Sequence, residues 1–325
     1  MAGGFAHMTL VDTISPGKSE GANTLSDQIK GALGSYTNFL ELGAVSPDYP
    51  YLTLFDQNAE GWANVMHYWH TMKVVRNAIP LICAMDNKSE DTKKCIAWLF
   101  GYLAHIVTDY TIHAVVFLKV GPYALNKMAH RDCELNQDVY IYNKIYGKKL
   151  DRDAYLEGAG IASCGPANNM GHLEPAVAQL WTKCLPPVPG TVFNLGDDLA
   201  HKPVAEPGVA PDPDKWHSNY VSMMDNVAHG SGYLPPLTRH LGVEAGIAYP
   251  ALDKLDMTCI ENLKTPEGVM HYDDVFRRTQ EEVKSAWLQL DGALSTGQLA
   301  CLTIPDGDLD TGCEKPKMIT WKETI

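Results

Sequence analysis

The sequence predicts an all-α protein, and two features of it carry that prediction. Apolar residues recur every three or four positions through several long segments, which is the period of a helix with one buried face. No stretch alternates apolar and polar residues convincingly over more than four positions, so no half-buried strand is predicted. With 45% hydrophobic and 20% charged residues, the composition is that of an ordinary globular protein. We therefore expect one multi-helix domain over residues 1–325, with a domain boundary near residue 190 as the alternative.

Four helices are predicted in the first half of the chain, and they span residues 25–42, 60–85, 92–120 and 122–146. Ser26 and Asp27 are residue types that cap the start of the first helix. Pro47 and Pro50 are expected to stop helix formation and to hold Asp48 in extended backbone. A polar break at residues 86–91 precedes the third helix, which is the most apolar of the four.

The second half of the chain is expected to begin with a long loop at residues 185–214. Seven prolines interrupt any helical or strand pattern there, namely Pro186, Pro187, Pro189, Pro203, Pro207, Pro211 and Pro213. The strongest later pattern is an apolar stripe over residues 272–294, which predicts a helix.

The acidic segment DGDLDTG, residues 306–312, has the early aspartate spacing of a calcium-binding loop. Position twelve of such a loop would be Lys317 where the motif needs a bidentate glutamate. We therefore expect an acidic turn near the C-terminus.

Charge and hydropathy exclude several classes of function. A formal net charge of −13 without a Lys/Arg stripe argues against nucleic-acid binding. Residues 95–118 are the most apolar segment, but His105 and Asp109 interrupt it, so no transmembrane segment is predicted. The N-terminus lacks the charged and apolar regions of a Sec signal peptide, so we expect a cytoplasmic protein, one secreted or injected by a non-Sec route, or a mature sequence. The oligomeric state is left open.

Metal-ligand residues recur at helical spacing in the third and fourth predicted helices. His105, Asp109 and His113 stand four residues apart and therefore share one helix face. His130 and Glu134 repeat this spacing. Eight residues of helix separate His105 from His113 by about 12 Å along the axis, which is too far for both to bind one zinc ion comfortably. The row predicts at least two metal ions with Asp109, whose two oxygens can bridge, between them.

The alternative interpretation is an amphipathic helix with ordinary core histidines, which is the commoner explanation of a single histidine. Four further candidate ligands lie earlier in the chain, namely His7, Asp48, His67 and His70. For Asp48 the alternative is a turn-capping side chain. The remaining six histidines are expected on the surface or in the core: His172, His201, His217, His229, His240 and His271.

In combination, these motifs resemble those of the zinc-dependent phospholipases C, which include bacterial phosphatidylcholine-hydrolysing enzymes. The matching motifs are AHMTL, the PD of GAVSPDYPY, MHYWHT, HIVTDYTIH and HRDCE, which together span residues 7–134. P1/S1-type nucleases are more distant relatives with the same metal framework. The resemblance implies an all-α domain of the phospholipase C/P1 nuclease type, with the helix at 272–294 as its closing helix.

The resemblance also implies two to three zinc ions and a ligand set for each. It assigns Asp48, His67, His105 and Asp109 to one ion; His7, with Asp109 bridging, to a second; and His113, His130 and Glu134 to a third. An N-terminal amine would complete the second site, and here Met1 or, after its removal, Ala2 would have to supply that amine. The i, i+3 spacing of His67 and His70 leaves the choice between them open, with His67 preferred.

The implied activity is hydrolysis of a phospholipid at a membrane surface to diacylglycerol and a phosphorylated head group. Asp48 would orient or deprotonate the attacking water. Tyr49 would face a choline ammonium through its ring. A P1/S1-type nuclease or 3′-nucleotidase is the enzymatic alternative, and a non-catalytic helical protein stabilised by zinc is the alternative from another class. Histidine and carboxylate ligands favour an open catalytic site over a closed cysteine-rich one.

Overall fold

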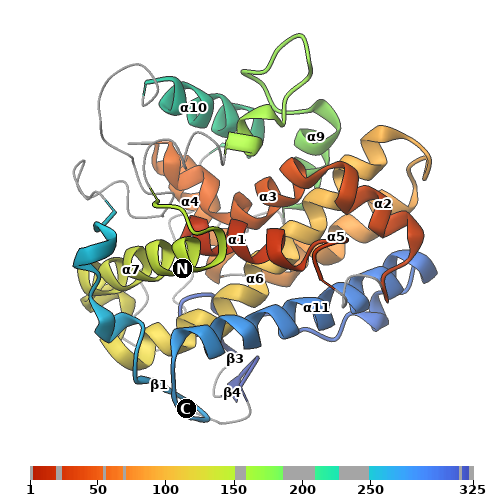
Figure 1. Cartoon of the computed structure of the whole chain (residues 1–325). Coiled ribbons are helices and arrows are strands. Elements are labelled where there is room, and N and C mark those ends of the chain that lie inside the picture. The colour runs from red at the N-terminus through yellow and green to blue at the C-terminus, as the bar shows by residue number, and fades with distance from the viewer. Residues whose placement is uncertain are drawn as a thin grey trace.

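The protein is described as a computed structural model covering residues 3–19, 24–53, 56–68, 71–150, 159–185, 209–226, 249–314 and 317–321. It is mostly helical, which confirms the predicted fold class (Figure 1). The α-helices of the described residues are α1 (Gly4–Ile14), α2 (Asp27–Ser35), α3 (Thr37–Val45), α4 (Gln57–Tyr68), α5 (Thr71–Cys83), α6 (Glu90–Val120), α7 (Lys127–Tyr146), α9 (Pro175–Cys184), α10 (Pro213–Asn226) and α11 (Tyr272–Thr296).

Short elements connect and flank these helices. The 3-10 helices are η2 (Ser46–Leu52), η3 (Tyr123–Leu125), η4 (Ala159–Ser163), η6 (Leu252–Lys254), η7 (Met257–Cys259) and η8 (Leu299–Cys301). Two antiparallel hairpins pair β1 (Leu263–Thr265) with β2 (Gly268–Met270) and β3 (Cys313–Glu314) with β4 (Lys317–Met318). With two or three residues each, these strands are too short to leave an alternating pattern in the sequence.

Helix α6 runs through the middle of the molecule and organises the core (Figure 1). Ser89 caps its start by accepting a hydrogen bond from the backbone N–H of Thr92 at 3.1 Å. Nearly every side chain from Cys95 to Val116 is buried, because α1, α2, α3, α5, α7, α9 and α11 all contact this helix. It is long and apolar enough to cross a membrane, but 78% of its most apolar 18-residue window is buried inside the protein.

Helices α3 and α6 approach so closely that only glycine fits at their crossing. A Cβ added at Gly43 would lie 2.0 Å from the carbonyl oxygen of Trp98, and one at Gly101 would lie 2.0 Å from that of Leu40. The two glycines face each other and bring the backbones into direct contact. This contact places α3 beside the metal-ligand face of α6.

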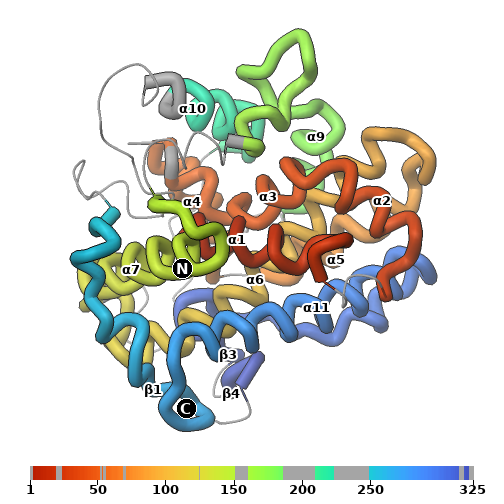
Figure 2. The backbone as a smooth tube through the Cα atoms, in the orientation of Figure 1, coloured from red at the N-terminus to blue at the C-terminus, as the bar shows by residue number. Residues whose placement is uncertain are grey.

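The remaining helices enclose α6 from several sides. Helix α1, red in Figure 2, packs against α7, in yellow-green. Helices α9 and α10 lie together at one end of the view, and α11 lies on the other side of α6 (Figures 1 and 2). The apolar stripe predicted for α11 is buried from Val275 to Leu290, and the indole N–H of Trp287 donates to the carbonyl of Phe100 at 3.0 Å.

One predicted helix proves to be a pair of helices. Residues 25–42 divide into α2 and α3 at Tyr36, whose φ of −129° and ψ of 48° are not helical, directly after Gly34 and Ser35. Helix α2 does begin directly after Ser26, as predicted. The hydroxyl of Ser26, however, donates to Asp291 at 2.8 Å and does not cap the helix. Of residues 60–85, the part up to Tyr68 belongs to α4 and Thr71–Cys83 form α5, and the two positions between them lie outside the described residues.

The expectation of extended backbone at Asp48 is wrong. Residues Ser46–Leu52 form the 3-10 helix η2, with Pro47 at its first turn. Proline fixes its own φ near −65°, which suits a 3-10 turn. Its ring restricts the backbone of the preceding residue, Ser46, and leaves the backbone of the following residue, Asp48, free to be helical. Pro47 therefore ends α3 but continues the chain in a tighter helix.

Parts of the proline-rich loop predicted at 185–214 lie outside the described residues, as do His70, Met1 and Ala2. One hydrophobic core runs from Phe5 to Trp321 and includes residues from both sides of position 190. Whether the chain is one domain or two stays a prediction.

Candidate metal centre

The fold brings together the eight side chains that the sequence indicates as metal ligands, although they come from five elements. All eight are buried, with at most 1% of each residue exposed. They are His7 on α1, Asp48 on η2, His67 on α4, His105, Asp109 and His113 on α6, and His130 and Glu134 on α7. They form three adjoining sets: the His7 group (His7, His105 and Asp109), the Asp48 group (Asp48, His67 and His105) and the Glu134 group (His113, His130 and Glu134).

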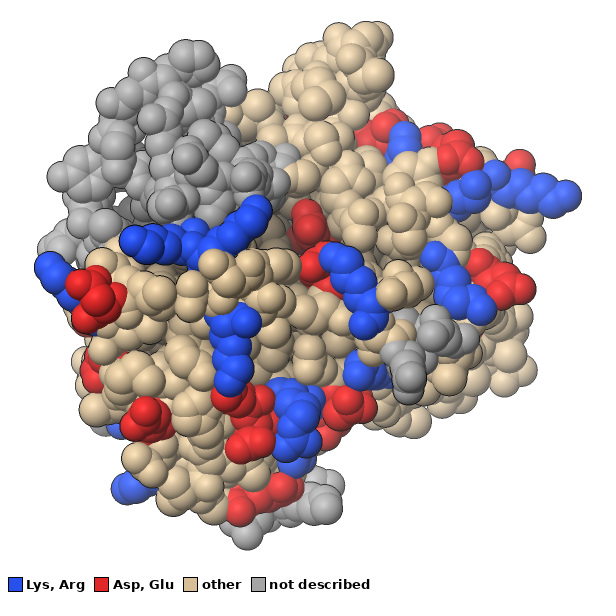
Figure 3. All heavy atoms as spheres, viewed as in Figure 1, with Lys and Arg blue, Asp and Glu red and all other residues tan. Residues whose placement is uncertain are grey.

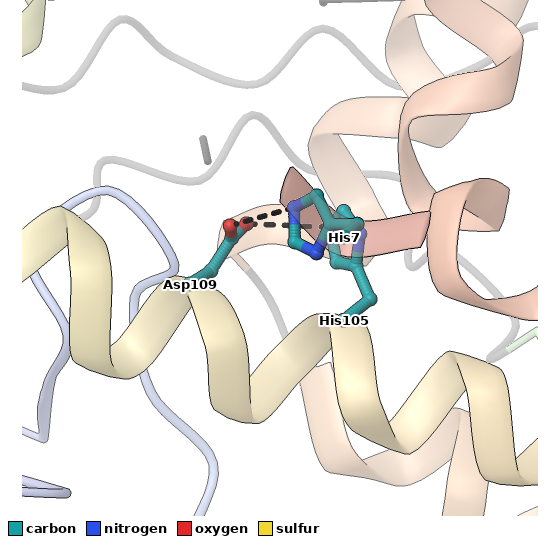
Figure 4. Close-up of side chains that lie close together, drawn as sticks. All are labelled: His7, His105 and Asp109. Carbon is teal, nitrogen blue, oxygen red and sulfur yellow. Dashed lines mark ion pairs between the residues drawn. The ribbon is translucent and has the colours of Figure 1, made fainter. Parts of the chain in front are cut away.

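In the His7 group, two imidazoles face the two oxygens of one carboxylate (Figure 4). His7 Nε2 lies 3.3 Å from Asp109 Oδ1, and His105 Nε2 lies 3.2 Å from Asp109 Oδ2. The two imidazole rings are stacked with their centroids 4.2 Å apart. Helix α1 is held in place by Asp138 on α7, which accepts from the backbone N–H of Ala6 at 2.7 Å.

In the Asp48 group, the histidines have defined ring orientations. Asp48 Oδ1 lies 3.1 Å from His67 Nε2 and 3.9 Å from His105 Nε2. On the opposite edge of each ring, His67 Nδ1 is 2.6 Å from the carbonyl oxygen of Ala63, and His105 Nδ1 is 2.8 Å from that of Ala44. A carbonyl can only accept, so each Nδ1 carries the proton and each Nε2 presents its lone pair to the group.

The Glu134 group joins α6 to α7. Glu134 Oε1 lies 3.0 Å from His130 Nε2, one helical turn away, and 3.2 Å from His113 Nε2. His113 Nε2 is also 3.8 Å from Asp109 Oδ1, so this group adjoins the His7 group. His105 and His113 therefore belong to different groups, as their separation along the helix predicted.

Electrostatics favour the protonation states that metal ligands need at Asp109, His7 and His130, but not at His105. Burial and the neighbouring His105 lower the pKa of His7, and burial lowers the pKa of His130. Burial alone would raise the pKa of Asp109, but His105 and His7 hold it well below its usual range. Burial likewise opposes protonation of His105, whose pKa is nevertheless raised by Asp109 and Asp48. An ionised Asp109 and neutral His7 and His130 are the states that bind divalent metal, whereas His105 has to give up its proton when a metal ion binds.

The donor atoms also fit zinc because several of them have no hydrogen-bond partner among the described residues. These buried atoms include His7 Nδ1 and Nε2, Asp48 Oδ2, His105 Nε2, and both ring nitrogens of His113. Buried polar atoms are normally paired, so several orphaned ones at one place indicate a missing cation. Imidazole nitrogens with a minority of carboxylates are the ligand set of catalytic zinc sites.

Other predicted residues lie near the centre but outside the three groups. Tyr49 is fully buried, its ring packs against those of Trp181 and Tyr220, and its hydroxyl lies 3.1 Å from His217 Nδ1. Its contact with a head group stays a prediction. His217 is a core histidine, as expected, and burial lowers its pKa to about 4. The choice of His67 fits its place in the Asp48 group, whereas His70 is not among the described residues.

Sequence reasoning missed the residues that hold the ligands in place. Ala63 precedes His67 by four residues on the same helix, so its carbonyl could have been identified from spacing. Asp138 follows Glu134 by one helical turn and could also have been identified. Ala44, whose carbonyl orients His105, gave no local signal.

Comparison with protein families identifies a family for this chain. The family described as zinc-dependent phospholipase C matches residues 6–186, which is more than half of the chain and includes all eight side chains. Comparison with curated proteins and with solved structures gives no match.

Proposed function

Because this chain belongs to the zinc-dependent phospholipase C family, whose members are phosphodiester hydrolases, we propose that it hydrolyses the glycerol-side phosphodiester of a phospholipid. The products are diacylglycerol and a phosphorylated head group, and phosphatidylcholine is the proposed substrate. The observation that carries the proposal is the set of three adjoining, buried histidine–carboxylate groups, of which two share His105 and the third adjoins Asp109 through His113.

The proposed reaction uses the residues of the centre in distinct roles. When bound, neighbouring zinc ions neutralise the charge of a phosphodiester and make water nucleophilic near neutral pH. Asp48 Oδ1 faces His67, whereas its buried Oδ2 has no hydrogen-bond partner among the described residues. We assign to Oδ2 the orientation and deprotonation of the attacking water. His67 and His105 are held in one tautomer by the carbonyls of Ala63 and Ala44, so their Nε2 atoms remain available as ligands.

Charge distribution supports a lipid substrate over a nucleic acid. The formal net charge is −13, and on the face in Figure 3 basic and acidic side chains are interspersed. Binding of a single strand would need a basic groove with stacking aromatics. A purely structural role for zinc is disfavoured by the ligand types, since none of the three groups includes a cysteine.

The proposal is tested by measuring zinc content and two activities on one preparation. Elemental analysis should find two to three zinc ions per chain, and chelation should abolish release of phosphocholine from phosphatidylcholine vesicles. Single-stranded DNA, assayed in parallel, should not be degraded. Absence of bound zinc, or degradation of DNA without lipid hydrolysis, would contradict the proposal.

A further inference from the structure

The acidic segment 306–312, which the sequence predicted to be an acidic turn, is docked against α4, which carries His67, and against α5. Asp306 anchors one end of it by accepting from the backbone N–H of Met72 at 2.8 Å and from Arg76 Nη1 at 3.1 Å. Further along, the backbone N–H of Leu309 donates to the carbonyl of His67 at 3.0 Å. The segment lies outside the part of the chain that matches the family.

This docking places the carboxylate of Asp310 beside the Glu134 group. Asp310 is 6% exposed, and its Oδ2 accepts a hydrogen bond from the hydroxyl of Tyr68 at 2.6 Å. Its Oδ1 lies 3.9 Å from Nδ1 of His113. The backbone N–H of Asp310 donates to Asp308 Oδ1 at 2.7 Å, which fixes the turn around it. The carboxylate is therefore directed at the ring edge of His113 that faces away from Glu134.

The chemistry of His113 requires an acceptor at that place. Its Nε2 faces Glu134 at 3.2 Å, so a neutral ring that binds metal through Nε2 must carry its proton on Nδ1. His67 and His105 donate the corresponding proton to backbone carbonyls. The Nδ1 of His113 is buried and has no hydrogen-bond partner among the described residues. Asp310 Oδ1 is close enough to become that partner after a small movement of either side chain.

We propose that Asp310 is a positioning residue of the metal centre, which accepts the Nδ1 proton of His113 and directs its Nε2 toward the ion of the Glu134 group. A carboxylate behind a metal-binding histidine fixes the tautomer and ring orientation and raises the basicity of the ligand. The C-terminal segment thereby contributes to a centre whose ligands all lie before residue 135. This inference depends on the zinc chemistry of the proposed function but not on its lipid substrate.

The test measures zinc affinity in the full chain by competition with a chromophoric chelator. Asp310→Asn keeps the shape of the side chain but removes its charge, and we expect one zinc ion to bind about 10- to 100-fold more weakly. Tyr68→Phe leaves the carboxylate of Asp310 but removes one of its hydrogen bonds. We therefore expect a smaller loss of zinc affinity at the same site. Asp306→Asn is the matched control, because it weakens the anchoring of the same segment without facing a histidine of the three groups.

A spectroscopic measurement separates positioning from general loosening of the fold. In the cobalt-substituted protein, the exchangeable Nδ1 proton of His113 should give a paramagnetically shifted resonance that moves or disappears in Asp310→Asn and persists in Asp306→Asn. Wild-type zinc affinity in Asp310→Asn would overturn the proposal, as would an equal loss in Asp306→Asn. Neither result would bear on whether the loaded protein hydrolyses phospholipid, so failure of this inference is distinct from failure of the proposed function.

Discussion

Replacement of Asp109 by alanine should disturb the metal centre more than replacement of any single histidine. One oxygen of Asp109 lies 3.3 Å from His7 Nε2, and the other lies 3.2 Å from His105 Nε2. His105 also belongs to the Asp48 group. A single substitution therefore removes a ligand at the junction of two groups. We expect Asp109→Ala to lose at least one zinc ion per chain together with its phosphodiesterase activity.

The expected loss of stability follows from linkage between zinc binding and folding. Free zinc at about 1,000 times the dissociation constant of a site stabilises the folded chain by about 4.1 kcal/mol. An unfolding entropy of about 2.1 cal/mol/K per residue gives about 0.7 kcal/mol/K for 325 residues. Loss of one site at that zinc concentration should therefore lower the melting temperature by about 6 °C.

The assay combines elemental analysis with thermal unfolding at a buffered free zinc concentration. Asp291→Ala is the control, because Asp291 is also a largely buried carboxylate, which accepts hydrogen bonds from the backbone N–H and the hydroxyl of Ser26 and from the hydroxyl of Ser295. The Asp291→Ala variant should have a lower melting temperature but keep all its zinc and its activity. Full zinc content in Asp109→Ala, or zinc depletion in Asp291→Ala, would refute the assignment of the bridging carboxylate.

Three further predictions concern catalysis, pH dependence and packing. Asp48→Asn should lower phosphatidylcholine hydrolysis by about 10²- to 10⁴-fold, and unchanged zinc content together with unchanged turnover would show that Asp48 is not the base. Burial raises the pKa of Glu41 to about 7. Between about pH 4.5 and pH 7 the folded chain therefore holds a proton that the unfolded chain has released, and the free energy of unfolding falls as the pH rises through this range. Glu41→Gln should therefore be as stable as the wild type below about pH 4.5 and more stable by about 3 kcal/mol at pH 8, as measured by denaturant titration. A pH-independent difference in stability would contradict this reasoning. Gly101→Ala should destabilise the protein by about 1–3 kcal/mol or more and weaken zinc binding, because its Cβ would push α3 away from α6. Gly34→Ala, whose Cβ would meet nothing within 4 Å, should leave zinc binding unchanged, and equal effects of the two alanines in calorimetry would argue against the close crossing.

The sequence was most informative where geometry is local. Within α6, the spacing of His105, Asp109 and His113 alone placed three side chains on one face and showed that the two histidines could not easily share an ion. His130 and Glu134 on α7 were predicted as a pair for the same reason, and the structure keeps them in one group. The helical period also predicted the extent of α6 and α11 to within two residues, and the end of α7.

Helix ends and breaks were less predictable, because they depend on contacts with distant residues. The division of residues 25–42 at Tyr36 is accompanied by a hydrogen bond from its hydroxyl to Glu90, which is 54 positions away. Ser26 has the chemistry of a helix cap but is bonded to Asp291 from the other end of the chain. The close crossing of Gly43 and Gly101 left no periodic signal, since a glycine contributes no side chain to a pattern.

The sequence by itself therefore determined the fold class, the candidate ligands and which of them stand together on single helices. These properties depend on side-chain chemistry and on a helix geometry that is the same in every protein. The tertiary structure decided that His7 and Asp48 join α6 at Asp109 and His105, and that the C-terminal Asp310 lies behind His113. Those contacts join segments separated by up to about 200 residues, and packing of the whole core fixes them because no local rule of spacing connects such distant positions.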